Sequence, residues 1–371
     1  MCIFRKISAF LLIGFIIACE ELPMSPDQVI SERDTNPQFV FIASTGSQYD
    51  IFTYAPEIGL IKDITNSPES ETSEFKISPD GLKILYERVA EDSIQLCTIN
   101  IDGSNFELLA TNSKSKFTAT FSPDGKEIIY STDIDGDQEV YIMNLSSKSA
   151  RNISNLHEIN GKLCNDNNPV FSSNELFVAF STQRFFDYWT DSKNFQIALI
   201  DLQNTDPINI SETEKSAFDP KFSYNSDFLT YAVDDPISLY SYDLNTKSKI
   251  QLTGSEKVSR YVSYDFYSVS PTENLITYSA ARPDNMTGAC EIYLLSLDGN
   301  KKEMITNLNP VHNVNTGNAV TPNFNSDGSK IVFIKPQEGT FYTINLKTNE
   351  MTKQVDFDIY NLRYVDFIYP Y

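Results

Sequence analysis

The sequence predicts an all-β fold in which one four-stranded antiparallel unit recurs along most of the chain. The first observation is a turn that recurs six times. Each copy has an apolar residue and then Ser or Asn before the turn, and the copies are Ile77–Gly81, Phe121–Gly125, Phe171–Asn174, Phe222–Asn225, Val269–Thr272 and Phe324–Gly328. Two copies read Ser-Pro-Asp-Gly, which suits a type I turn because proline sets φ at the second position and glycine follows at the fourth. The six Ser or Asn residues are spaced 44, 50, 51, 47 and 55 residues apart.

Two further positions recur with the turn. An aromatic residue stands eight positions after each Ser or Asn, at Tyr86, Tyr130, Phe180, Tyr231, Tyr278 and Phe333. Each aromatic ends one β-rich run, and another follows, as in Glu139–Leu145, Glu291–Leu297 and Phe341–Leu346. Each unit then closes on an apolar residue before Thr, Ser or Ala, at Leu109, Ile153, Ile210, Leu252, Ile305 and Met351. A four-stranded unit with a repeat of ~40–50 residues is typical of a β-propeller blade.

These residues resemble the repeat of the TolB-type β-propellers, whose blades carry the same Ser-Pro-Asp-Gly turn and a terminal Leu-Thr. The resemblance extends from about Gln38 to Tyr371. It implies a propeller fold. It implies little about function, because the same blade architecture serves many tasks.

We expect a single propeller of seven blades over residues 38–371. Three further strands, Phe39–Ile42, Asp50–Tyr54 and Ile61–Thr65, form a unit that lacks only its first strand. A spare strand, Leu362–Ile368, follows the last complete unit. Pairing it with the N-terminal three would close the ring and remove an open edge. Six or eight blades also fit the spacing, because strand boundaries read from a sequence shift by ~2–4 residues.

The N-terminus predicts a lipid-anchored protein. Arg5 and Lys6 precede an apolar run, Ile7–Ala18, which is shorter than the ~20 residues that a membrane-spanning helix needs and suits a secretion signal. The run ends in Ile16-Ile17-Ala18-Cys19, which resembles the bacterial lipobox. The resemblance implies that residues 1–18 are removed, that Cys19 carries the acyl chains (palmitate among them), and that residues 19–37 form a flexible tether. A cleaved signal with a chance cysteine at its end is the alternative.

The net charge and the cysteine content limit which cell compartments and which binding partners are consistent with the sequence. Loss of Arg5 and Lys6 takes the net charge from −21 to −23, which disfavours nucleic acid and anionic lipid surfaces as electrostatic partners. We expect the bacterial cell envelope, on the periplasmic face of the outer membrane or at the cell surface. Besides Cys2 and Cys19 the chain has Cys97, Cys164 and Cys290, an odd number that argues against a disulfide framework. A bridge between Cys164 and Cys290, both expected in loops, is left open.

Long loops on one face of the propeller hold the candidate ligand-binding residues. Loops carry function on rigid scaffolds, and these loops gather both histidines, the single tryptophan and several Arg and Tyr residues. The candidates are His157, Arg184, Phe185, Tyr188, Trp189, Tyr261, Tyr264, Arg282 and His312. Aromatic and arginine side chains together would suit a sugar ring or anchor a protein partner. The alternative is that some of the rings fill the channel or pack the loops onto their blades.

We expect a monomeric, non-enzymatic module that binds an envelope protein, a peptide or a glycan, without a cofactor, a metal or catalytic residues. The alternative function is a metal-dependent lyase, since oligogalacturonate lyases are similar propellers with a histidine-based metal site. The two histidines here form no spaced pair, and a zinc-type site would need carboxylates such as Asp166 or Asp265. The segment Asp133–Glu139 looks like part of a calcium loop, but it lacks the full ligand pattern, and its Asp-Gly pair predicts a hairpin turn.

Overall fold

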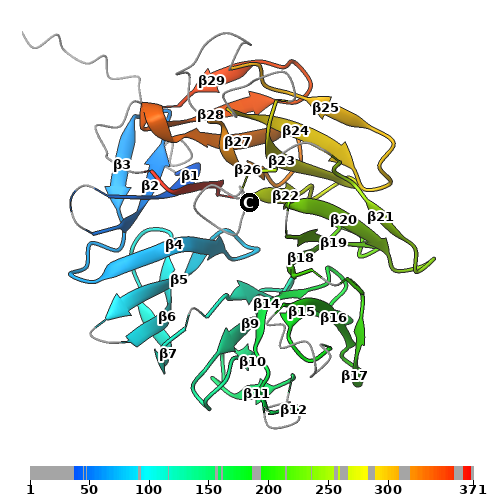
Figure 1. Cartoon of the computed structure of the whole chain (residues 1–371). Coiled ribbons are helices and arrows are strands. Elements are labelled where there is room, and N and C mark those ends of the chain that lie inside the picture. The colour runs from blue at the N-terminus through cyan, green and yellow to red at the C-terminus, as the bar shows by residue number, and fades with distance from the viewer. Residues whose placement is uncertain are drawn as a thin grey trace, which may run out of the picture.

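The computed structural model describes residues 37–368 apart from 45, 47, 91–92, 116, 155–157, 160–161, 186–193, 214, 235, 255–257, 260–265, 283–288, 309–317 and 355–361. In this part of the chain the strands form seven four-stranded antiparallel sheets and one two-stranded hairpin, β12 (Glu158–Ile159) with β13 (Lys162–Leu163). Figure 1 shows the seven sheets as blades around one axis. The expected seven-bladed propeller is confirmed.

Six blades each use four strands that follow one another in the chain, with the first strand innermost. Blade 1 has β4 (Ser70–Ile77), β5 (Lys83–Ala90), β6 (Ser93–Asn100) and β7 (Glu107–Ser113), and blade 2 has β8 (Thr120–Phe121), β9 (Glu127–Thr132), β10 (Glu139–Asn144) and β11 (Ala150–Asn152). Blade 3 has β14 (Asp166–Phe171), β15 (Phe177–Thr182), β16 (Gln196–Asp201) and β17 (Asn204–Asn209), and blade 4 has β18 (Ala217–Phe222), β19 (Phe228–Val233), β20 (Ser238–Asp243) and β21 (Lys249–Gln251). Blade 5 has β22 (Tyr267–Val269), β23 (Leu275–Ala281), β24 (Cys290–Ser296) and β25 (Lys302–Met304), and blade 6 has β26 (Val320–Phe324), β27 (Lys330–Lys335), β28 (Thr340–Asn345) and β29 (Met351–Lys353).

Blade 7 joins the two ends of the propeller. Its strand order is β3 (Leu60–Asp63), β2 (Asp50–Ala55), β1 (Phe39–Ala43) and β30 (Tyr364–Phe367). The C-terminal strand β30 takes the innermost position and pairs with β1, with Phe367 opposite Phe39. The prediction that the last strand supplies the missing first strand of the N-terminal unit is therefore confirmed.

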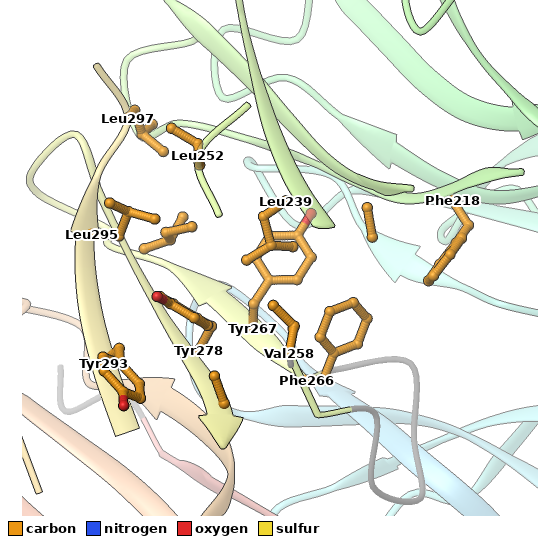
Figure 2. Close-up of a cluster of buried hydrophobic side chains, with 13 residues drawn as sticks. Phe218, Leu239, Leu252, Val258, Phe266, Tyr267, Tyr278, Tyr293, Leu295 and Leu297 are labelled. Carbon is orange, nitrogen blue, oxygen red and sulfur yellow. The ribbon is translucent and has the colours of Figure 1, made fainter. Parts of the chain in front are cut away.

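The hydrophobic core is divided among the seven junctions between neighbouring blades. Among the described residues, each of seven buried clusters draws its side chains from two adjacent blades. Figure 2 shows the cluster between blades 4 and 5, where Phe218 and Leu239 meet Tyr267 and Tyr278. The outer strands, by contrast, are largely exposed. Each blade is therefore stabilised mainly by its two neighbours, so the ring has to close.

The recurrent aromatic has a position in this core that explains its spacing. Each of the six aromatics lies on the second strand of its blade, is at most 5% exposed, and belongs to a different inter-blade cluster. Directly across the sheet, four of them face another aromatic and stack on it, as Tyr231 does on Tyr240 at 5.6 Å between ring centroids. Such pairs contribute ~0.5–1.5 kcal/mol beyond the area they bury.

The recurrent serine holds the turn together. In blade 1 the Ser78 hydroxyl donates to Asp80 Oδ1 at 2.5 Å and accepts the Lys83 N–H at 2.8 Å. Three further blades repeat the arrangement with Ser122, Ser172 and Ser223. Where the motif has Asn in place of Asp, the amide oxygen accepts the same hydrogen bond. The motif is thus a self-contained hydrogen-bonded turn.

The terminal Thr or Ser of a unit fastens the outer strand. Five such hydroxyls accept the N–H of a residue fourteen positions earlier on the third strand, at 2.8–3.0 Å; the acceptors are Thr65, Ser154, Ser211, Thr253 and Thr306. This bond satisfies a backbone donor at the point where the outer strand leaves the sheet.

One expectation about the cysteines is wrong, and one open question is answered. Cys290 does not lie in a loop but begins β24, and it is 5% exposed. Cys97, Cys164 and Cys290 are all buried thiols, so the bridge left open between Cys164 and Cys290 is not formed. Each thiol is a small buried side chain, and burial raises the pKa of the Cys290 thiol.

Candidate functional site

The two ends of the blades form different faces. The connections between first and second strands, and between third and fourth strands, lie on one face, which carries the recurrent serine turns. The connections between second and third strands and from one blade to the next lie on the other face, which we call the loop face. Of the nine candidate residues, Arg184, Phe185 and Arg282 are described and follow second strands, so they lie on the loop face. The others, His157, Tyr188, Trp189, Tyr261, Tyr264 and His312, lie outside the described residues, as does Cys19.

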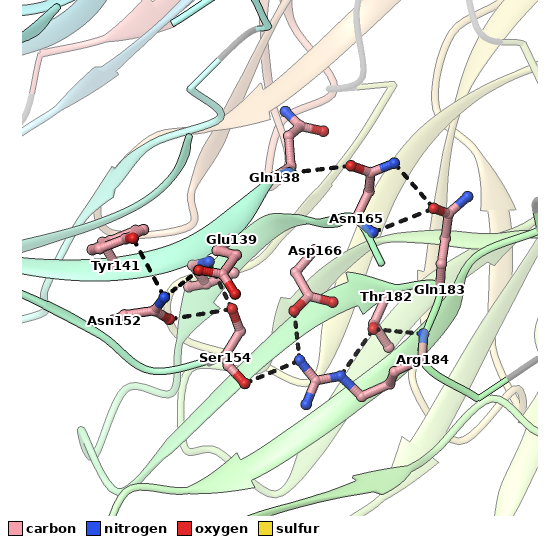
Figure 3. A network of polar contacts seen from close by, with 11 residues as sticks. Gln138, Glu139, Tyr141, Asn152, Ser154, Asn165, Asp166, Thr182, Gln183 and Arg184 are labelled. Atoms are coloured by element: carbon pink, nitrogen blue, oxygen red, sulfur yellow. Dashed lines mark hydrogen bonds and ion pairs between the residues drawn. The ribbon is translucent and has the colours of Figure 1, made fainter. Parts of the chain in front are cut away.

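Arg184 forms a buried clamp between blades 2 and 3. Its guanidinium pairs with Asp166 Oδ2 at 2.5 Å, and the two side chains are only 6% and 0% exposed. The guanidinium also donates to the carbonyl oxygen of Ser154 at 3.3 Å and to Thr182 Oγ1 at 3.1 Å (Figure 3). Burial raises the pKa of the Asp166 carboxyl, and the neighbouring guanidinium opposes this effect. Arg184 thus holds the base of the loops on either side of β14 and β15, and its direct contact with a ligand stays a prediction.

A polar network continues from this clamp along the loop face. Asn165 accepts the Gln138 N–H and donates to Gln183, which links the hairpin of blade 2 to blade 3. On blade 2, Asn152 bonds to the buried carboxylate of Glu139. This network serves to fix the loops.

The other two described candidates, Phe185 and Arg282, do not form one polar site with Arg184. Phe185 packs against the cluster between blades 2 and 3. Arg282 lies on blade 5 and donates to Asn307 Oδ1 at 2.6 Å. Blade 4 stands between Arg184 and Arg282, so the structure does not bring these two arginines into one site.

The segment that looks like a calcium loop is a hairpin turn. The Gly136 N–H donates to the Asp133 carbonyl oxygen at 3.0 Å. Asp133 Oδ1 accepts the Ser113 hydroxyl and the Lys114 N–H, while Asp135 accepts the Tyr141 hydroxyl. Within the described residues, no three His, Cys, Asp or Glu side chains are grouped so that they could hold a metal ion.

A channel cavity of about 420 Å³ lies on the propeller axis, and the sequence did not predict it residue by residue. It is lined by the innermost strands or their approaches in blades 1–5. Its charged lining residues carry both signs: Glu74, Lys76, Glu87, Asp219 and Lys221. Lys221 Nζ donates to the Tyr267 carbonyl oxygen at 2.8 Å, lies 3.6 Å from Asp219 Oδ2 and lies over the Tyr267 ring at 4.6 Å.

The inner strands approach the channel with strained backbone. Thr118, Asn168, Asp219 and Thr321 have φ between 41° and 54°, which non-glycine residues seldom adopt. Asn168, Asp219 and Thr321 each precede a proline and lie at an irregularity in the pairing of the first and second strands. Proline offers no N–H to the ladder, so a bulge is favoured there. The proline that recurs in these three strands is the sequence feature from which the channel wall could have been predicted.

Hydrogen bonds between blades fix these bulges around the axis. The Thr118 N–H donates to Glu87 Oε1 of blade 1 at 3.0 Å. Thr118 Oγ1 in turn accepts the Asn168 N–H of blade 3 at 3.1 Å. Backbone strain of this kind collects at binding sites that the surrounding structure holds in shape. The channel wall is thus a preorganised surface.

The fold and the channel together define a propeller protein whose rigid ring presents one axial cavity and one face of long loops. Residues 77–310 match the TolB beta propeller domain, and the chain belongs to this family. A 78-residue stretch is 33% identical to the Tol-Pal system protein TolB of Blochmanniella floridana, over 21% of this chain and 17% of that protein.

Among solved structures, TolB from Acinetobacter baumannii is similar with a TM-score of 0.52 and 16% identity, over 72% of this chain and 63% of that one. The oligogalacturonate lyase of Vibrio parahaemolyticus is similar with a TM-score of 0.60 and 12% identity, over 87% and 86%. This chain thus spans less than two thirds of these two TolB proteins. At these identities the structural likeness shows the fold alone.

Proposed function

We propose that this protein is a lipid-anchored binding module of the bacterial envelope, whose propeller recruits an envelope protein or peptide, or a glycan, without catalysing a reaction. The observation that carries the proposal is the channel cavity. Its volume of about 420 Å³ lies within the range of ligand pockets, ~300–1,000 Å³, and its wall combines apolar side chains with fixed charges. A relative named as a Tol-Pal system protein supports an envelope protein as the partner. The lyase alternative would use His157 and His312, which lie outside the described residues.

The position of the N-terminal strand supports the same proposal. β1 begins on the face opposite the loop face, where Phe39 pairs with Phe367 and the Ile368 N–H donates to the Gln38 carbonyl oxygen. A tether over residues 19–37 would therefore reach the propeller from the serine-turn face. A bilayer anchor at Cys19 would thus leave the loop face free of the point of attachment. No helix in the described part of the chain is long and apolar enough to span a bilayer.

Filling the channel should strongly reduce capture of the partner. Ser268 lines the cavity and is half-buried, so Ser268→Trp should place an indole in the channel and lower in-cell cross-linking to the partner by about tenfold or more, or ~1.4 kcal/mol. Ser146→Trp is the matched control, because Ser146 lies on an exposed turn of the face opposite the loop face. The pair Tyr188→Ala with Trp189→Ala tests the loop face. Thermal unfolding of each variant checks folding. Equal capture by all variants would contradict the proposed binding surface.

Replacing the acylated cysteine should release the protein from membranes. With Cys19→Ser we expect most of the chain in the soluble fraction, because stable anchoring needs at least two acyl chains or a second signal. Cys2→Ser, which alters a residue of the expected signal, should fractionate as the unchanged protein does. Mass spectrometry of the N-terminal peptide supplies the direct measurement. Unchanged membrane association of Cys19→Ser would refute the anchor.

A further inference from the structure

An arginine lies flat on a tyrosine ring at the loop-face end of blade 7. Arg363 Cζ is 3.7 Å from the centroid of the Tyr49 ring. Arg363 directly precedes β30, the innermost strand of the blade, and Tyr49 directly precedes β2. Both strands begin on the loop face, so the stacked pair stands on that face beside the propeller axis. Both residues are half-buried.

The backbone holds both members of the pair in place. The Arg363 N–H donates to the Ile42 carbonyl oxygen at 3.0 Å. The Tyr49 N–H donates to Ser70 Oγ of blade 1 at 3.2 Å, which fixes the loop before β2 across the blade junction. A guanidinium that is already stacked loses little conformational freedom when it binds a ligand.

The guanidinium of Arg363 has no hydrogen-bond acceptor among the residues that the structure describes. The other arginines near blade ends are engaged: Arg88 with Glu69 and Gln95, Arg184 with Asp166, and Arg282 with Asn307. The chain has 50 acidic and 29 basic residues, so an arginine without an acidic partner among the described residues stands out against this excess of carboxylates. A planar guanidinium with open N–H donors matches a carboxylate through two parallel hydrogen bonds.

We propose that Arg363, positioned by Tyr49, binds a carboxylate of a peptide partner on the loop face. This inference rests on the proposed binding function and names the chemistry of the ligand. The strongly negative chain repels acidic ligands at long range, so one fixed cation gives the site its position and specificity. The guanidinium already covers one face of the Tyr49 ring, so this ring offers less area for stacking on a sugar. What remains available is the donor edge of the guanidinium, which suits a planar anion.

The binding of acetate to the full chain tests the site. With arginine labelled by ¹⁵N, acetate added against chloride at constant ionic strength should shift one Nε–H resonance in a saturable way. Arg363→Lys should remove that resonance and lower acetate affinity by about tenfold, because an ammonium lacks the planar fork. Tyr49→Phe, which keeps the ring, should bind as the unchanged protein does, and Tyr49→Ala more weakly. Arg151→Lys, at an exposed arginine on the outer strand β11, is the matched control. No saturable shift, or equal binding by Arg363→Lys, would overturn the proposal.

A second arm identifies the source of the carboxylate. A short peptide with a free C-terminal carboxylate should bind more tightly than its amidated form and more tightly than galacturonate. Tighter binding of galacturonate would overturn the assignment to a peptide. These measurements need no cellular partner. Failure of in-cell capture with acetate binding intact would therefore count against the proposed recruitment and not against the carboxylate site.

Discussion

Arg184→Ala should lower the free energy of unfolding by about 3–5 kcal/mol, because it leaves the Asp166 carboxylate buried without its cation. Asp166 is 0% exposed and pairs with Arg184 within blade 3, and Arg184 also reaches the Ser154 carbonyl oxygen of blade 2. The same change removes the donors to Ser154 and Thr182. Denaturant unfolding measured by tyrosine and tryptophan fluorescence supplies the free energy.

Two further variants distinguish the cost of leaving a buried charge unpaired from the cost of losing the contacts of Arg184. Lys126→Ala breaks the exposed pair with Asp124, whose side chains are 76% and 36% exposed, and should leave the free energy of unfolding nearly unchanged, because solvent screens the pair. Arg184→Met combined with Asp166→Leu should recover most of the stability lost by Arg184→Ala, since an apolar pair needs no counter-charge. A loss below 1 kcal/mol in Arg184→Ala would show that the clamp does not stabilise the blade junction.

Ending the chain after residue 361 should abolish stable folding. The removed strand buries Leu362, Tyr364, Val365 and Phe367, each at most 8% exposed. Burial of side chains of this size contributes ~1.5–3 kcal/mol each, which together approaches the ~5–15 kcal/mol that stabilises a typical domain. The truncation also exposes β1 as an open, apolar strand edge, which favours aggregation. Size-exclusion chromatography and denaturant unfolding would measure both effects.

A chain that ends at Ile368 retains β30 and is the control for this truncation. It should elute at the same size as the full chain and unfold at the same denaturant concentration. Equal midpoints for the two truncations would mean that β30 adds nothing to the ring, contrary to its pairing with β1.

The repeat could be predicted from sequence because its determinants are local. The Ser78 turn forms its hydrogen bonds within six residues, and the aromatic at Tyr86 is set by the length of the strand that follows. The closing role of Leu362–Ile368 followed from counting strands. Cys290, expected in a loop, belongs to β24, because its strand begins one residue earlier than its alternating pattern indicated.

Ligand binding by the candidate residues stays a prediction, because six of the nine lie outside the described residues. Arg184 was expected on a ligand-binding face, and it lies on the loop face, buried in a pair with Asp166 on the neighbouring strand of the same blade. The channel wall at Thr118 and Asn168, and the stack of Arg363 on Tyr49, join residues 50 and more than 300 positions apart. Nothing in the neighbouring sequence indicates such pairs.

By itself the sequence determined the blade, its turn, its buried aromatic and the number of strands, since each depends on spacing within about fifty residues. Only the tertiary structure decided which charged side chains are neutralised and which keep open donors on the loop face. The physical reason is that folding sets the distance between residues of different strands, and that distance decides whether a charge is paired, as at Arg184, or available, as at Arg363.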